Sequence, residues 1–387
     1  MIKKFGSLFA GHVDFESVGF DAPPVNDRWL SDEDLGGVFD KATSIAKTLD
    51  STGFDTFWLA EHHFQREGHE AIPNILMLAV HLAHLTDKVK FGCGFNILPA
   101  WHPLRLAEDF AMADRLTGGR VIFGIGRGYH TREVETLGAP MVDNDANREL
   151  FEEQVEVLFK ALNEPSFSHH GKHYDIPPKI QYRGYELEQI TLVPAPLNRP
   201  VDCWQPIVSG SKSALDLMVK HGIKGMIGGG AAAGGAHDST VAAWRDALVR
   251  GGRQEAVLGE DLIIGLVVFI SESKEKAVAE ASKYFEENMK MFAPLGFVGG
   301  ITDQQITAMS DTTRIHSASL PTLWDAANAG SWLVGTPDDV IEGLSAYQER
   351  FPGLEHVNVG QVVGTPEQVI VEQLQRFSED VMPVFKR

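Results

Sequence analysis

A carboxylate and two imidazoles, Glu61-His62-His63, are the residues best placed to do chemistry, because they directly follow an apolar run. The run at 57–60 has the length and composition of a strand that is buried on both faces. Ligands of α/β folds bind at the carboxyl ends of such strands. Glu61 and His62 are therefore candidate catalytic residues that hold or move a proton. The alternative is that this cluster only ties neighbouring loops together.

These histidines, with His102 and His130, also raise the question of a metal centre. Adjacent residues of a strand point to opposite faces, so His62 and His63 do not converge on one ion. No HxH or HExxH spacing lies near them. We therefore expect no catalytic metal.

Two turns have the composition of anion-binding sites. Residues 124–128 are Gly-rich and contain Arg127, whose guanidinium can bind a phosphate through two parallel hydrogen bonds. They lack the full GxGxxG pattern of a dinucleotide fingerprint. Ser209, Gly210 and Ser211 offer hydroxyl and backbone N–H groups before a predicted helix. In a closed barrel the two turns could share one phosphate; the alternative for each is an ordinary tight turn.

Small residues inside the predicted strand at 89–97 are a further candidate site. Gly92, Cys93 and Gly94 follow one another, and glycine in a strand marks a bulge or the close approach of a ligand. A flat aromatic ring lying against this strand would account for the missing side chains. Asn96 could hydrogen-bond such a ring or a substrate; the alternative is an amide satisfied within the core.

Alternating strands and helices must position these residues. Between Leu35 and Leu49 apolar residues recur at helical spacing, and Gly53 lies where a C-terminal cap is expected. Strand–helix repetition with short links implies a parallel sheet with right-handed crossovers. Eight strands close an α/β fold of this kind into a (β/α)8 TIM barrel. The predicted strands lie at 5–10, 57–60, 89–97, 121–125, 207–209, 225–227, 262–270 and 356–360.

Two long stretches interrupt the alternation within what we expect to be a single domain, 1–387. Residues 164–200 look like an inserted segment with a hairpin, whose histidines at 169, 170 and 173 are expected to be solvated. Residues 293–330 show no clear period, and loops this long are lids or disordered segments. A lid is the better interpretation, because apolar residues there could cover an apolar cavity. They are Phe292, Leu295, Phe297, Leu320, Leu323 and Trp324.

Two similar segments near the end, 334–340 and 363–369, predict helix starts. In each, a threonine, Thr336 or Thr365, can cap the helix and a proline suits its first turn. Thr365 and Gln368 also have the spacing of a capping box.

Composition excludes several classes of function. The formal net charge of −19 over 387 residues argues against nucleic acid or an anionic membrane as partner. Cys93 and Cys203 are too few for a disulfide framework and suit a reducing cytosol. The N-terminus has neither a signal-peptide pattern nor a membrane span. These features predict a cytoplasmic enzyme.

Several separate motifs, taken together, resemble the luciferase-like flavin monooxygenases, the family of the bacterial luciferase α chains. They occur in the family's order at 54–64, 98–110, 118–130, 334–340 and 378–387. Residues 1–20 and 101–110 are also similar to the limonene 1,2-monooxygenase branch.

This resemblance implies that the barrel binds reduced flavin, as FMN or alternatively FAD, at its C-terminal face. The isoalloxazine would lie against a non-proline cis peptide, carried over to Gly94-Phe95, and His62 would be the active-site histidine with Glu61 beside the ring. The luciferase cysteine before the phosphate arginine is Gly126 here, which argues against light emission. The residues assigned to cofactor binding are Gly94, Phe95, Asn96, Arg127, His130, Ser209, Gly210 and Ser211.

The resemblance further implies a two-component monooxygenase that forms a C4a-hydroperoxyflavin from reduced flavin and O2. A separate NAD(P)H:flavin reductase would supply the flavin, and His62 would hold or move a proton at the peroxide. The substrate would be a small hydrophobic molecule such as a monoterpene, and the chain would form a homodimer. Two alternatives are an F420-dependent oxidoreductase that transfers hydride and a non-catalytic flavin-binding or partner subunit.

Overall fold

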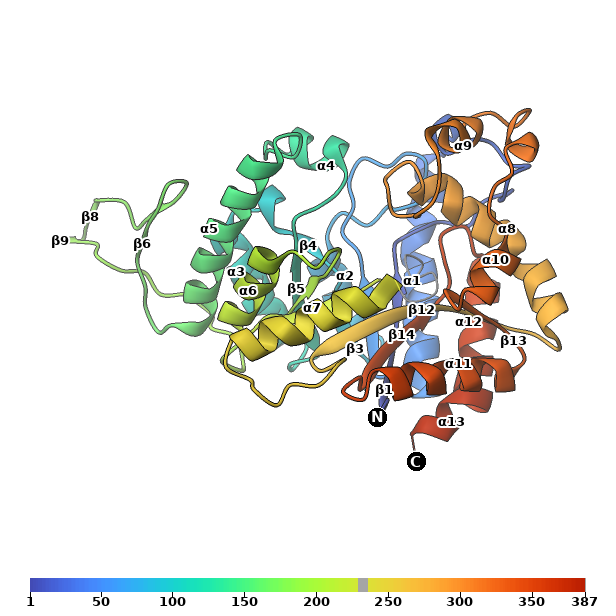
Figure 1. The fold of residues 1–387 in the computed structure, drawn as a ribbon. Coiled ribbons are helices and arrows are strands. Elements are labelled where there is room, and N and C mark those ends of the chain that lie inside the picture. Colours follow the sequence, from blue (N-terminus) through green and yellow to red (C-terminus); the bar gives the residue numbers. More distant parts are fainter. Residues whose placement is uncertain (229–235, 387) are drawn as a thin grey trace.

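Eight parallel strands close into a barrel in the computed structural model, which describes residues 1–228 and 236–386 (Figure 1). Each barrel strand pairs with the next in chain order, β5 with β10 included, and pairing of β14 with β1 completes the circle, which confirms the predicted (β/α)8 barrel. The barrel strands are, in order around it, β1 (Lys4–Phe9), β2 (Thr56–Leu59), β3 (Lys90–Cys93), β5 (Val121–Gly126), β10 (Cys203–Pro206), β11 (Lys224–Ile227), β12 (Leu262–Ile270) and β14 (His356–Gly360).

The strand registers decide which side chains point into the barrel. Leu8 lies beside Trp58, Trp58 beside Gly92, and Gly92 beside Ile122, so these residues share the inner face. The rings of Trp58 and Trp204 meet edge to face across the lumen, 5.9 Å apart. A Cβ atom added to Gly92 would lie 2.3 Å from the Trp58 ring. The indole, rather than a ligand, therefore accounts for the missing side chain at Gly92, which corrects that part of the sequence interpretation.

Helices cover the outside of the barrel (Figure 1). In α1 (Asp32–Thr52), Ser31 and Asp34 form a capping box, and Gly53 ends the helix with a φ of 80°, as predicted. The other longer helices are α2 (Ile75–Ala83), α3 (Pro103–Leu116), α5 (Asn144–Asn163), α6 (Lys212–His221), α7 (Ala236–Arg250), α8 (Lys274–Phe292), α11 (Pro337–Arg350) and α12 (Glu367–Arg376). None of the helices in the described ranges has the length and apolar character required to cross a lipid bilayer.

Three strands differ from the prediction. The strand predicted at 207–209 is β10, because the chain leaves the sheet after Pro206 and Val208 is 79% exposed. The strand predicted at 89–97 is divided into β3 and β4 (Asn96–Ile97), with a cis peptide between Gly94 and Phe95 as the resemblance implies. A strand that was not predicted, β13 (Trp332–Gly335), pairs with β12 outside the barrel.

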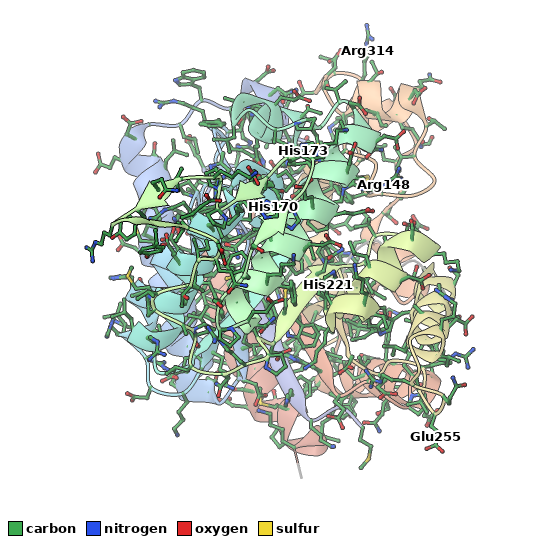
Figure 2. All side chains as sticks on the ribbon, turned by 90° about the vertical axis from the view of Figure 1, so that its left-hand side faces the viewer. Arg148, His170, His173, His221, Glu255 and Arg314 are labelled. Atoms are coloured by element: carbon green, nitrogen blue, oxygen red, sulfur yellow. The ribbon has the colours of Figure 1, made fainter. Side chains whose placement is uncertain are left out.

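The inserted segment forms two short hairpins that project from one side of the barrel (Figure 1). They are β6 (His169–His170) with β7 (Asp175–Ile176), and β8 (Gln181–Tyr182) with β9 (Tyr185–Glu186). Figure 2 shows His170 and His173 on the same side of the molecule as Arg148 of α5. Both histidines are exposed as predicted, but His169 is buried, with its Nε2 3.1 Å from Glu153. The expectation of solvation is therefore wrong for His169.

Residues 293–330 contain short helices rather than a structureless loop. Leu323 is buried in an apolar cluster with residues of α8 and β13, so it packs beside the barrel. Near the C-terminus, Thr336 caps α11 as predicted, but Asp14 rather than Thr365 accepts the first N–H of α12, from Glu367, at 3.0 Å. The remaining short helices are η1 (Val25–Asp27), η2 (Leu98–Ala100), α4 (Thr131–Thr136), α9 (Asp303–Ala308), η3 (Ile315–Ser317), α10 (Leu323–Asn328), η4 (Phe377–Val381) and α13 (Met382–Phe385).

A methyl group added at Gly92 tests the packing of the lumen. In the Gly92→Ala protein the new Cβ would overlap the Trp58 indole, so we expect the free energy of unfolding to fall by about 1–3 kcal/mol in urea denaturation. Gly37→Ala on α1 is the matched control, because nothing lies within 4 Å of the Cβ that it adds. It should raise the free energy of unfolding by up to about 1 kcal/mol. Unchanged stability of the Gly92→Ala protein would contradict this packing.

Candidate active site

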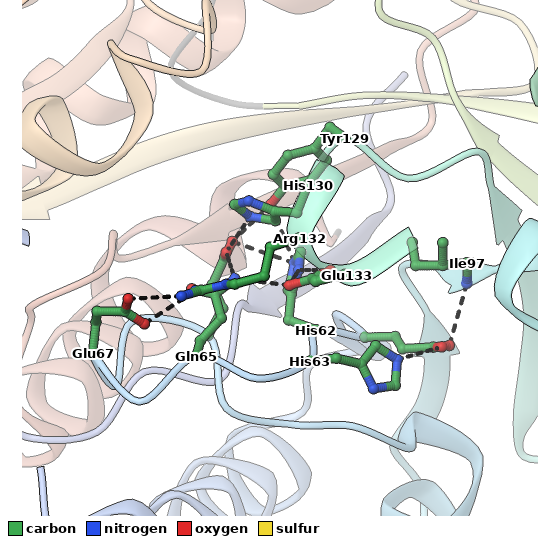
Figure 3. Close-up of polar contacts among 11 residues, drawn as sticks. His62, His63, Gln65, Glu67, Ile97, Tyr129, His130, Arg132 and Glu133 are labelled. Atoms are coloured by element: carbon green, nitrogen blue, oxygen red, sulfur yellow. Dashed lines mark hydrogen bonds and ion pairs between the residues drawn. The ribbon is translucent and has the colours of Figure 1, made fainter. Parts of the chain in front are cut away.

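His62 lies just beyond β2, at the carboxyl rim of the barrel, and both of its ring nitrogens have partners (Figure 3). Its Nδ1 lies 3.3 Å from both carboxylate oxygens of Glu133. Its Nε2 lies 3.2 Å from the Tyr129 hydroxyl and 3.3 Å from Oε1 of Glu70. Tyr129 and Glu133 follow β5, so the network joins the ends of two barrel strands that are separated by β3.

Glu70 is the centre of this network. It accepts a hydrogen bond of 2.7 Å from the Tyr129 hydroxyl and one of 2.9 Å from the side-chain amide of Gln65, and it lies 2.8 Å from Nε2 of His130. The same Gln65 amide donates to Glu133 at 2.9 Å. One amide therefore fixes the two carboxylates that face His62.

Burial and charge shift the pKa values of this network in opposite directions. Burial alone would lower the pKa of His62, but the negative charges of Glu70 and Glu133 raise it above its usual value. Burial alone would raise the pKa of Glu70, but His62 and His130 lower it to about 2. Burial and the charge of Glu70 raise the pKa of Tyr129 well above its usual value. At neutral pH Glu70 is therefore ionised, and its surroundings favour the protonated form of His62.

Glu61, the second predicted catalytic residue, has a different set of partners. Its carboxylate accepts hydrogen bonds from the indole N–H of Trp101 at 2.8 Å and from the backbone N–H of Ile97 at 3.2 Å. It also lies 3.0 Å from Nε2 of His63. These are contacts of the kind that tie loops together, and the catalytic role of Glu61 stays a prediction.

Arg127 and the turn at 209–211 follow neighbouring strands, because β5 pairs with β10. Nε of Arg127 donates to Oδ1 of Asn147 at 2.7 Å, and Nη2 donates to the backbone and side-chain oxygens of Asn144 at 3.1 and 2.9 Å. These bonds to the first turn of α5 orient the guanidinium. All three residues of the turn are exposed, and Ser211 precedes α6 without a side-chain cap.

The end of β3 lies between His62, which follows β2, and Arg127, which follows β5, because β3 pairs with both strands. A Cβ atom added to Gly94 would lie 3.4 Å from the Trp58 ring, an ordinary contact distance, so packing alone does not require glycine there as it does at Gly92. Asn96 is fully buried, and its amide donates to the carbonyl of Gly124 at 2.8 Å. Its Oδ1 has no hydrogen-bond partner in the described part of the chain.

One atom each of His62, Glu70 and His130 lies within 4.8 Å of the others, a distance at which a divalent cation could also bind. Each of these atoms already has a hydrogen-bond partner in the network, so the cluster is satisfied without an ion. The expectation that the site holds no metal stays a prediction.

Sequence reasoning missed Gln65, Glu70, Tyr129 and Glu133. The last two follow the same predicted strand as Arg127, so their place near a strand end was an available signal. Glu70 lies far along the irregular loop after β2, where no periodicity indicates the direction of a side chain.

A further buried carboxylate, Glu287 of α8, fixes the loops around the network. It accepts a hydrogen bond from Arg28 at 3.1 Å and lies 2.9 Å from both Nε2 of His69 and Nζ of Lys290. Arg28 belongs to the loop after β1, and His69 precedes Glu70 in the loop after β2. Burial alone would raise the pKa of Glu287, but its three partners lower it to about 2.

The barrel and the residues at its rim define the class of protein. The family model of luciferase-like monooxygenases matches residues 18–354, and the chain belongs to this family.

Named relatives in this family are monooxygenases. Limonene 1,2-monooxygenase of Rhodococcus erythropolis is 33% identical over 153 residues, 39% of this chain and 36% of the relative. The alkanal monooxygenase alpha chain of the Kryptophanaron alfredi symbiont is 31% identical over 140 residues, 36% of this chain and 38% of the relative. The oxygenase component of the trigonelline monooxygenase of Acinetobacter baylyi is 28% identical over 163 residues, 42% of this chain and 41% of the relative. The chain therefore aligns with well under half the length of these relatives.

Solved structures share the fold over nearly the whole chain. The oxygenating constituent of 3,6-diketocamphane monooxygenase from Pseudomonas putida, in complex with FMN, has a TM-score of 0.74 at 18% identity and covers 99% of this chain and 98% of that one. The F420-dependent tetrahydromethanopterin reductase of Methanopyrus kandleri has a TM-score of 0.65 at 15% identity, over 100% of both chains. At these identities the likeness shows the fold alone.

Replacing Glu287 tests the electrostatic support of the rim. Because the pKa of Glu287 is lowered on folding, its charge stabilises the fold above its usual pKa of 4.5, and this contribution is lost as the pH falls towards 2. Glu287→Gln leaves Arg28 and Lys290 without their counter-charge and should cost about 3–5 kcal/mol near pH 7. In urea denaturation, the difference from wild type should shrink between about pH 4 and about pH 3.

The neighbouring, less buried carboxylate provides the control for this experiment. Glu286 accepts a backbone hydrogen bond of 3.0 Å from Phe20. Glu286→Gln should therefore cost about 1 kcal/mol or less. Equal losses in the two variants, or a Glu287→Gln difference that does not depend on pH, would contradict the assigned role.

Proposed function

We propose that this chain is the oxygenase component of a flavin-dependent monooxygenase, which uses reduced FMN and O2 to oxygenate a small hydrophobic substrate such as a monoterpene. The observation that carries the proposal is the parallel pairing of β5 with β10. It sets Arg127 and the turn at 209–211 on neighbouring strands, at the rim that also holds His62. Anion-binding groups and a titratable group at one rim suit a phosphorylated redox cofactor. Membership of the family and its named monooxygenases support the same activity.

A flat, largely apolar ring would bind at the mouth of the barrel. Burial of a ring there would be favourable, because the surface it would cover is apolar and partly exposed. Asn96 Oδ1, buried without a partner in the described residues, could accept a hydrogen bond from a ring N–H. Bound there, reduced flavin would supply the electrons that activate O2. The partly exposed residues that face inward at the strand ends are Leu8, Ala10, Phe95, Pro206, Gly265 and Gly360.

Arg127 would bind the phosphate of the cofactor. Within the described residues it forms no ion pair with a carboxylate, and burial together with the charge of Arg148 lowers its pKa. An anion is therefore the partner that this guanidinium lacks. Ser211 and the first N–H groups of α6 would add further donors.

His62 would be the charged group next to the reacting atoms, and residues 293–330 would close over it. Phe297 meets Tyr129 edge to face at 4.9 Å, and Phe292 packs on Phe297 at 6.2 Å. This contact connects the proposed lid with the network around His62. An apolar cover would exclude water during the reaction and would favour an apolar substrate.

A separate NAD(P)H:flavin reductase is the proposed source of electrons. The sequence has no complete dinucleotide fingerprint of its own. One relative is named an oxygenase component, which supports the proposal that a separate protein reduces the flavin.

A second copy of the chain is proposed to pack against α2 and α3. These helices contact each other and carry exposed apolar side chains, which are typical of subunit interfaces. The exposed large apolar residues on or just after the two helices are Met77, Leu85, Met112 and Leu116.

Anaerobic mixing tests the proposed activity. The purified protein would be mixed with reduced FMN, FAD or F420 without oxygen, and air would then be admitted in the presence of limonene. We expect reduced FMN to bind most tightly and oxygen to be consumed in step with an oxygenated product. Reduction of a substrate by F420 without oxygen would support the hydride-transferring alternative. Flavin binding with no product would support the non-catalytic subunit, and either result would overturn the proposal.

Removing the guanidinium of Arg127 tests the phosphate site. Arg127→Ala should weaken the binding of reduced FMN at least tenfold, which corresponds to about 1.4 kcal/mol, in an anaerobic titration. Reduced riboflavin has no phosphate, so its binding should be unchanged. Arg132→Ala is the matched control, because Arg132 forms an exposed pair with Glu67. Equal loss for FMN and riboflavin would contradict the assignment.

A further inference from the structure

The two nitrogens of His62 face two carboxylates. Glu133, from α4, takes Nδ1, whereas Glu70, from the loop after β2, lies beside Nε2 together with the Tyr129 hydroxyl. Tyr129 donates its own proton to Glu70, so its oxygen can accept a hydrogen bond from Nε2–H of His62. A neutral imidazole has only one N–H to donate. The doubly protonated ring is the form that satisfies both sides of this arrangement.

The charges of the neighbouring carboxylates also favour the doubly protonated form of His62. Glu70 is 1% exposed and Glu133 is 2% exposed. Within the described residues neither forms an ion pair with a lysine or arginine side chain; the nearby Arg132 pairs with Glu67. Buried carboxylates need a compensating positive charge. Among the described basic side chains of this network, only His62 pairs with both of them; the Gln65 amide, which also contacts both, is neutral.

We propose that Glu70 and Glu133 are positioning residues that hold His62 as an imidazolium with both N–H groups fixed, so that the site presents a permanent positive charge. The catalytic consequence of this proposal rests on the function proposed above. A fixed positive charge in a site shielded from water stabilises negative charge that develops on oxygen, and it does so without reorganisation during the reaction. The same charge also holds the loop after β2 against the loop after β5.

The groups that face His62 from each neighbouring element agree with this assignment. Glu61 adds a third negative charge from the end of β2, and its effect also raises the pKa of His62. Tyr129 is neutral because its pKa is raised well above its usual value. The ring of His130 lies edge-on to that of His62 at 5.3 Å and is itself paired with Glu70. The side chains around His62 therefore carry more negative than positive charge, which favours its protonated form.

A pH titration of His62 by NMR tests the proposal on the flavin-free protein. Histidine would be isotope-labelled, and the His62 signal would be assigned from a His62→Gln protein. We expect the wild-type imidazole to titrate above its usual pKa of 6.5. In Glu133→Gln and in Glu70→Gln the titration should move down by about one pH unit or more, a tenfold loss of proton affinity. Two separate variants keep the test valid if one of them fails to fold.

Glu67→Gln is the matched control, because Glu67 lies in the same loop but pairs with Arg132. It should leave the His62 titration at its wild-type position. A wild-type pKa at or below 6.5, or equal values in all variants, would overturn the proposal. So would stoichiometric binding of Zn²⁺ that abolishes the His62 titration, because the cluster would then be a metal site. Absence of flavin binding with the expected titrations would refute only the proposed function.

Discussion

Parallel pairing of β5 with β10 is the constraint on which the site depends. A parallel sheet brings all its carboxyl ends to one edge, and this pairing brings the fifth predicted strand beside the fourth across the inserted segment 164–200. Arg127 and the turn at 209–211 follow neighbouring strands for that reason. The lumen beneath is packed by Trp58 and Trp204, so a ligand of the barrel would be confined to its mouth.

Buried negative charge is the second organising feature. Glu70, Glu133 and Glu287 have no solvent to stabilise them, and each recruits histidine, arginine or lysine from a different loop. The loops after β1, β2 and β5 are therefore fixed to one another and to α8 by electrostatics as well as by packing. His69 and Glu70 are adjacent in sequence, and so connect the supporting cluster around Glu287 directly with the network around His62.

The sequence predicts the barrel well because hydrophobic periodicity is a local signal, and the number of strands follows from counting the segments that show it. It places His62 and Arg127 near strand ends for a similar reason, since His62 lies shortly after β2 and Arg127 directly after β5; their roles stay predictions. It does not predict Glu70, because the direction of a side chain within an irregular loop depends on contacts such as that of Gln65 with Glu133. Gly92 and Asp14 show the same limit: one glycine is explained by an indole on a neighbouring strand, and one helix cap comes from the opposite end of the chain. Tertiary partners of this kind leave no pattern in a single sequence.

A crystal structure with bound FMN would test the central claim, that one rim of the barrel holds a phosphorylated flat ring. The account predicts the phosphate between Arg127 and the turn at 209–211, with the ring against Gly94-Phe95 and within reach of His62. FMN bound elsewhere, for example in the cavity of about 350 Å³ between α8 and α12 that is lined by Lys276 and Arg376, would contradict it.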